Sequence, residues 1–110
     1  MPHIRLAEGV PGIRSAFQFS PGTARPMLDL AEVLLRGANS LSSAEREMIA
    51  ARVSRLNACH FCEASHRAAA AHHLDGDYRV VDAVLADPDS APIGAKFRAL
   101  LNIAGRVVHG

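Results

Sequence analysis

The chain has 110 residues, a length typical of one hydrophobic core, so the sequence predicts a single domain over residues 1–110. Its 12 Lys and Arg residues nearly balance 11 Asp and Glu residues, and this excludes the strongly basic composition typical of nucleic-acid-binding proteins and of proteins that bind anionic membranes. Hydrophobic residues make up 49% of the chain but aromatic residues only 5%, which favours close-packed helices and predicts an all-α fold.

Two helices are expected in the first third of the chain. Pro11 can open a short helix, because proline suits the first helical position. A second, buried helix is expected over residues 24–36, where Leu, Met and Ala recur with helical period, and Gly37 should end it.

The middle of the chain predicts an antiparallel pair of helices. Ser42 and Glu45 have the S-x-x-E spacing of a capping box, so a third helix should start at Ser42. The chain is expected to reverse near Asn57 and to continue into an Ala-rich fourth helix that ends near Leu74.

Two more helices complete the expected fold. Asp77 can cap a fifth helix, residues 87–90 form a loop, and residues 97–108 carry the apolar stripe of a last helix. The prediction is a compact bundle of about six helices. A C-x-x-C motif marks the start of the central helix of the antiparallel pair.

That motif contains Cys59 and Cys62, the only two cysteines, with Glu47 upstream and His66 downstream. A straight helix would hold Glu47 roughly 18 Å from Cys59, at about 1.5 Å rise per residue. Reversal near Asn57 instead places Glu47 and His66 at similar distances from the turn, so their side chains could face each other. Cys62 and His66 are four residues apart and share a helix face.

These residue types point to thiol redox chemistry. A helix N-terminus and a neighbouring imidazole both favour the thiolate of Cys62, which can attack a hydroperoxide and become a sulfenic acid. Glu47 would orient His66 or accept a proton through it, and Cys59 would condense with the sulfenic acid to form a disulfide. An external dithiol must then reset the pair.

The expected location is the cytoplasm. No charged segment leads into an apolar run at the N-terminus, and no stretch approaches 18 apolar residues, so neither export nor membrane insertion is expected. In reducing cytosol a disulfide is more often catalytic than structural.

A family resemblance rests on the same residues. Arg46-Glu47, the segment 53–62 (VSRLNACHFC) and His66 resemble the alkylhydroperoxidase D-like group of the carboxymuconolactone decarboxylase superfamily. The resemblance implies that Glu47, Cys59, Cys62 and His66 are the catalytic residues. Better-studied relatives have a His immediately before the second cysteine, whereas this chain has Phe61.

The resemblance also implies a single alkylhydroperoxidase D-like helical domain over residues 1–110 that assembles into dimers, trimers or hexamers. It implies a peroxidase that needs no haem, metal or other cofactor. The partners would be a hydroperoxide substrate and a reductant protein of the lipoyl or thioredoxin type.

Three other interpretations stay open at the level of sequence. Cys59, Cys62, His66 and Glu47 could bind zinc in an interaction module. The two thiols could be buried apolar groups. The chain could also be a carboxymuconolactone decarboxylase-like enzyme, in which no redox cysteines take part.

Overall fold

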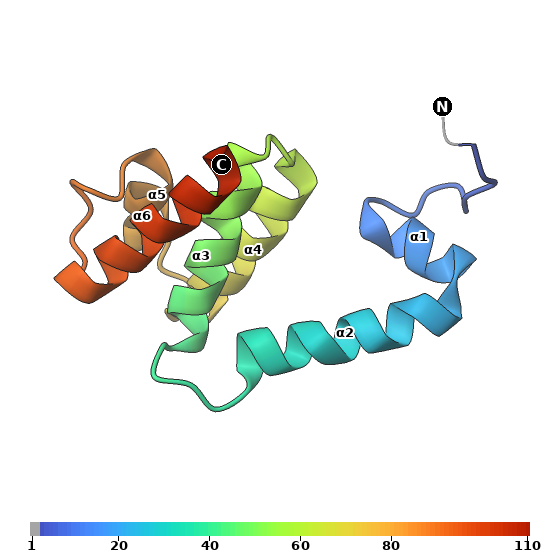
Figure 1. Ribbon diagram of the computed structural model, residues 1–110, viewed down its shortest axis with the longest axis horizontal. Helices are drawn as coiled ribbons and strands as arrows, with labels where there is room; N and C mark the ends of the chain where they lie inside the picture. The colour runs from blue at the N-terminus through green and yellow to red at the C-terminus, as the bar shows by residue number, and fades with distance from the viewer. Residues whose placement is uncertain (1–2) are drawn as a thin grey trace. The chain divides into compact units, whose positions relative to one another are not determined.

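The computed structural model describes residues 3–110 and contains six α-helices, with no β-strand in that part of the chain (Figure 1). The all-α prediction is therefore confirmed. By their contacts the residues form two units, one that ends at Ala38 and one that spans Asn39–Gly110. The single-domain organisation stays a prediction. The helices are α1 (Ile13–Phe19), α2 (Pro21–Arg36), α3 (Ser43–Leu56), α4 (His60–His72), α5 (Arg79–Ala86) and α6 (Ala95–His109).

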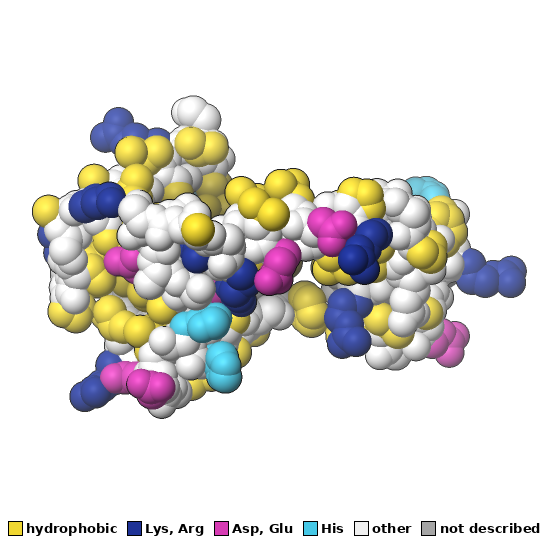
Figure 2. Space-filling model, turned by 90° about the horizontal axis from the view of Figure 1, so that it is seen from below, with side chains coloured by type: hydrophobic (Ala, Val, Ile, Leu, Met, Phe, Trp, Pro, Cys, Tyr) yellow, Lys and Arg dark blue, Asp and Glu magenta, His cyan; other side chains and the backbone are white. Residues whose placement is uncertain are grey.

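The first unit contains α1 and α2. Helix α2 begins at Pro21, earlier than expected, because proline is preorganised for the first turn of a helix. The prediction that α2 is buried is wrong for this unit, since Leu28 is 52% exposed and Leu34 is 60% exposed. The physical reason is that, within this unit, the helix that packs against α2 is the seven-residue α1, which is too short to cover the apolar stripe. Figure 2 shows such hydrophobic side chains at the surface among charged ones.

Helix α3 starts where the capping box predicts. Ser42 Oγ accepts a hydrogen bond from the Glu45 backbone N–H at 3.1 Å, and Glu45 Oε2 accepts one from the Ser42 backbone N–H at 2.8 Å. Two backbone donors that the helix leaves unpaired are thereby satisfied. The capping box thus fixes the position of Glu47 along α3.

The chain reverses between α3 and α4 through a tight turn. Ala58 adopts a left-handed conformation with φ of 54°, and the Cys59 backbone N–H donates to Ser54 O at 2.9 Å. Helices α3 and α4 then lie side by side and make the most extensive contacts between any two helices (Figure 1). Ala51 and Ala70 are fully buried, and their small side chains let the two backbones approach closely. The antiparallel pair is confirmed.

Helices α5 and α6 complete the second unit by packing on α3. Tyr78 occupies the N-cap position of α5, but the Asp77 side chain makes the capping contact that the sequence predicts, because its Oδ1 accepts a hydrogen bond from the Arg79 backbone N–H at 2.9 Å. Asp77 also accepts a hydrogen bond from the Arg79 side chain, and this bond is the main cause that lowers the pKa of Asp77 to about 2. No helix within residues 3–110 is long and apolar enough to cross a membrane. The core side chains are Met48, Ala51, Ala70, Val81, Val84, Leu85, Ala91, Phe97 and Leu101.

Candidate active site

The two cysteines lie at the N-terminus of α4. Cys59 is the N-cap residue and Cys62 belongs to the first turn, as expected for a motif that starts the helix. They form a disulfide with their Cα atoms 5.4 Å apart, and both residues are half-buried. Cys59 Sγ also accepts a hydrogen bond from the Cys62 backbone N–H at 3.4 Å. Both sulfurs therefore lie at the end of the helix whose backbone N–H groups favour negative charge.

Glu47 and His66 meet across the interface between α3 and α4. Glu47 Oε2 lies 2.6 Å from His66 Nδ1, a short hydrogen bond in which Nδ1 donates when it carries the proton. The Glu47 side chain is 2% exposed and that of His66 is 31% exposed. A buried carboxylate needs such a partner, because desolvation disfavours an unpaired charge. The contact depends on the antiparallel pairing, since the two residues are nineteen positions apart.

Helix geometry connects this pair to the cysteines. His66 follows Cys62 by four residues on α4, so the two side chains are neighbours on one face. With Nδ1 directed at Glu47, the Nε2 atom of His66 is left to exchange a proton with other groups. The arrangement can therefore pass a proton between a thiol and a buried carboxylate.

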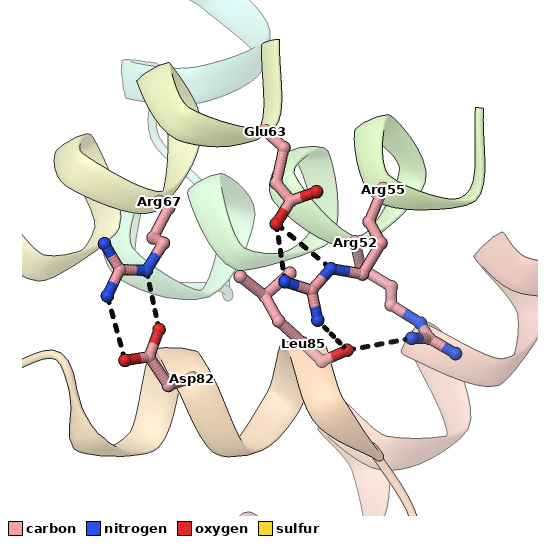
Figure 3. Close-up of polar contacts among 6 residues, drawn as sticks. All are labelled: Arg52, Arg55, Glu63, Arg67, Asp82 and Leu85. Atoms are coloured by element: carbon pink, nitrogen blue, oxygen red, sulfur yellow. Dashed lines mark hydrogen bonds and ion pairs between the residues drawn. The ribbon is translucent and has the colours of Figure 1, made fainter. Parts of the chain in front are cut away.

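Arg55 is a site residue that the sequence reasoning missed (Figure 3). Its Nε and one terminal nitrogen donate to Glu63 Oε1 at 3.0 and 2.6 Å, and its other terminal nitrogen donates to Leu85 O at 2.8 Å. The hydrogen bond from Arg55 is the main cause that lowers the pKa of Glu63. Because Glu63 follows Cys62 directly, Arg55 fastens the cysteine-bearing turn of α4 to α3 and α5. The sequence does contain an indication of this pair. Arg55 lies in the last turn of α3 and Glu63 in the first turn of α4, where the helix dipoles favour a positive and a negative charge respectively.

A second ion pair joins α4 to α5 next to His66. Arg67 donates two hydrogen bonds to the Asp82 carboxylate, at 2.6 and 2.9 Å (Figure 3). Its guanidinium also lies 4.3 Å from the centre of the Tyr78 ring, within cation–π range. The hydrogen bond from Arg67 chiefly lowers the pKa of Asp82. Since Arg67 follows His66, the pair restrains the backbone that carries the imidazole.

Phe61 directly precedes Cys62 in the C-x-x-C motif. This phenylalanine lies in the first turn of α4 and is 40% exposed. Residues 3–110 contain no group of three or more His, Cys, Asp or Glu side chains placed to share a metal ion. The structure pairs these side chains in two contacts. The two cysteines form a disulfide, and Glu47 contacts His66.

Comparison with known proteins gave one match. The family model described as carboxymuconolactone decarboxylase family matches residues 21–106, which include both cysteines, Glu47 and His66. No curated protein and no solved structure matches the chain. Because the match covers well over half of the 110 residues, the chain belongs to the carboxymuconolactone decarboxylase family.

Proposed function

We propose that the chain is a thiol-dependent peroxidase of the alkylhydroperoxidase D-like branch of this family. The observation that carries the proposal is the disulfide at the N-terminus of α4, one turn before a histidine that contacts a buried glutamate. A half-buried C-x-x-C pair at a helix N-terminus is the environment in which thiols become reactive. Family membership alone is compatible with this role, because the family includes both decarboxylases and peroxidase-like enzymes.

The first chemical step is the attack of Cys62 on the hydroperoxide. In the reduced protein His66 takes the proton from the Cys62 thiol, and Glu47 stabilises the imidazolium through the 2.6 Å contact. The thiolate attacks the terminal oxygen of the hydroperoxide, and the O–O bond breaks. Cys62 becomes a sulfenic acid, while the alkoxide takes a proton from His66 and leaves as an alcohol.

Cys59 completes the oxidative half of the cycle. Its sulfur attacks the sulfenic sulfur, the S–O bond breaks, and the oxygen leaves as water as the disulfide forms. The disulfide in the structure corresponds to this oxidised state. Two electrons must then come from an external dithiol, which we expect to be a lipoyl or thioredoxin-type protein. No metal or organic cofactor enters the cycle, and the family resemblance leads us to expect a homo-oligomer.

The proposal is tested by peroxide consumption with a dithiol in excess. Cys62→Ser should abolish turnover, because no nucleophile remains beside His66. Cys59→Ser should allow one oxidation and leave a sulfenic acid that a dimedone-type reagent traps. Ser65→Ala, a change on an exposed position of the same helix, is the matched control and should retain activity.

The same assay can reject the proposal. Equal peroxide consumption by Cys62→Ser and the unaltered protein would remove Cys62 from the reaction. A reduced protein that consumes no hydroperoxide would favour the decarboxylase interpretation, in which the cysteines take no part.

A further inference from the structure

The Asn39–Gly110 unit contains a cavity that neither cysteine lines. This cavity of about 350 Å³ opens between the end of α3 and the second half of α6. Its apolar wall contains Leu101, which is 1% exposed, and Leu56, which is half-buried. The volume falls in the range of roughly 300–1,000 Å³ found for pockets that hold small organic molecules.

The polar wall of this cavity carries an excess of positive charge. Arg52 and Arg106 line it together with His109, and Asp89 is the single acidic group. Two guanidinium groups against one carboxylate leave a net charge of +1, to which a protonated His109 would add. Asp89 is already engaged, because its Oδ1 accepts a hydrogen bond from Asn102 Nδ2 at 3.1 Å.

The two arginines are available to a ligand in different ways. Arg52 is half-buried, and one terminal nitrogen donates to Leu85 O at 3.2 Å, which holds the guanidinium in place (Figure 3). Its remaining N–H donors are not used by that contact. Arg106 is exposed on the last turn of α6, and within residues 3–110 its guanidinium makes no hydrogen bond or ion pair. A carboxylate or a phosphate is the ligand that guanidinium groups bind best, because either can accept two parallel N–H hydrogen bonds.

Gly105 leaves open space in the wall of this cavity. It lies inside α6 and lines the cavity, although alanine is far more favourable than glycine within a helix. A Cβ atom at this position would lie 3.7 Å from Leu56 Cδ1, an ordinary van der Waals contact, so packing does not require glycine. The missing side chain does keep the cavity open next to its apolar wall.

This cavity is separate from the thiol site. On α3, Glu47 faces α4 through its contact with His66, whereas Arg52 and Leu56 project roughly 140–180° around the helix from Glu47, at about 100° per residue. None of the lining residues is a cysteine or belongs to α4.

We propose that this cavity binds a small organic anion. Its carboxylate or phosphate group pairs with Arg52 and Arg106, and its apolar part covers Leu56 and Leu101. The positive charge of the two arginines favours an anion, and the open space at Gly105 gives room for the apolar part of the ligand.

The test is an NMR titration of the whole ¹⁵N-labelled protein with benzoate, phenyl phosphate and benzyl alcohol. Both anions share the ring of the neutral alcohol, so the three probes separate charge from apolar contact. Saturable shifts are expected for an anion at the amides of Arg52 and of residues 101–109. Tighter binding of benzoate would assign the site to carboxylates, and tighter binding of phenyl phosphate to phosphate esters. Benzyl alcohol should bind at least tenfold more weakly.

Two variants decide whether the cavity residues are responsible. Arg106→Gln should weaken anion binding about tenfold, as expected for the loss of one charged hydrogen bond. Arg5→Gln removes the same charge from an exposed position in the other unit and should leave binding unchanged. Gly105→Ala should raise the melting temperature and weaken anion binding, a combination that a purely structural glycine would not give.

Three results would overturn the proposal. The absence of saturable shifts with either anion would show that Arg106 and His109 only stabilise the C-terminus of α6. Equal binding of benzyl alcohol would show that charge is not recognised. Unchanged anion binding by Arg106→Gln would place the bound molecule elsewhere.

Discussion

The exchange Glu47→Gln isolates the charge of the buried carboxylate. Glutamine has nearly the same shape and can still hydrogen-bond His66 Nδ1, so the packing between α3 and α4 is kept. What is lost is the negative charge 2.6 Å from the imidazole, in a side chain that is only 2% exposed. The imidazolium that forms when His66 takes the thiol proton is then no longer stabilised by an ion pair.

The size of the effect follows from the hydrogen bond. A hydrogen bond with a charged partner contributes about 1.5–3 kcal/mol net, and one between neutral groups about 0.5–1.5 kcal/mol. The difference of about 1.5 kcal/mol corresponds to a rate of Cys62 oxidation that is roughly tenfold lower. Glu47→Ala removes the side chain altogether and leaves a cavity beside an unpaired imidazole, so the free energy of unfolding should fall by about 2–4 kcal/mol.

The assay is stopped-flow oxidation of the reduced protein by a hydroperoxide, with urea unfolding of each variant in parallel. Glu32→Gln makes the same chemical change on the exposed side of α2 and should react at the unaltered rate. An unchanged oxidation rate in Glu47→Gln would refute the role of the carboxylate charge. If the oxidation rate falls only in variants whose free energy of unfolding also falls, Glu47 acts through packing and its charge has no role in the reaction.

Further changes test the elements around the site. His66→Ala should slow oxidation more than Glu47→Gln in the same stopped-flow assay, because the proton acceptor itself is removed. Ser42→Ala removes the capping box and should lower the free energy of unfolding in urea by about 1 kcal/mol. Glu63→Gln should cost at most about 1 kcal/mol at pH 7, because this ion pair is partly exposed. Arg55 lowers the folded-state pKa of Glu63, so the stabilisation is present above the ordinary value of 4.5 and is lost as pH falls through the lowered value. A Glu63→Gln effect that persisted at low pH in unfolding curves would contradict this sign.

The sequence carried most of the information on the second unit. The capping box at Ser42 and the reversal near Asn57 are local signals, and together they determine which residues of α3 and α4 face each other. For that reason the meeting of Glu47 and His66 could be predicted from their positions on either side of the turn. The catalytic roles of these residues remain part of the proposal, since geometry does not report reactivity.

Two features could not be predicted because they depend on tertiary context. The apolar stripe of α2 indicates a buried face, but periodicity does not say whether another element covers it, and Leu28 and Leu34 are exposed. Arg55 donates hydrogen bonds to both Glu63 and Leu85 O, and Leu85 is thirty positions away in the chain. No spacing rule predicts such a contact, because it requires α5 to dock beside the turn between α3 and α4.

Counting free thiols shows whether Cys59 and Cys62 exchange electrons with a hydroperoxide. The reduced protein, with two free thiols, is treated with one equivalent of hydroperoxide, and its thiols are titrated before and after. We expect that both thiols are lost, that peptide mapping finds a Cys59–Cys62 disulfide, and that a dithiol restores both thiols. Two thiols that remain titratable after hydroperoxide treatment would contradict this expectation.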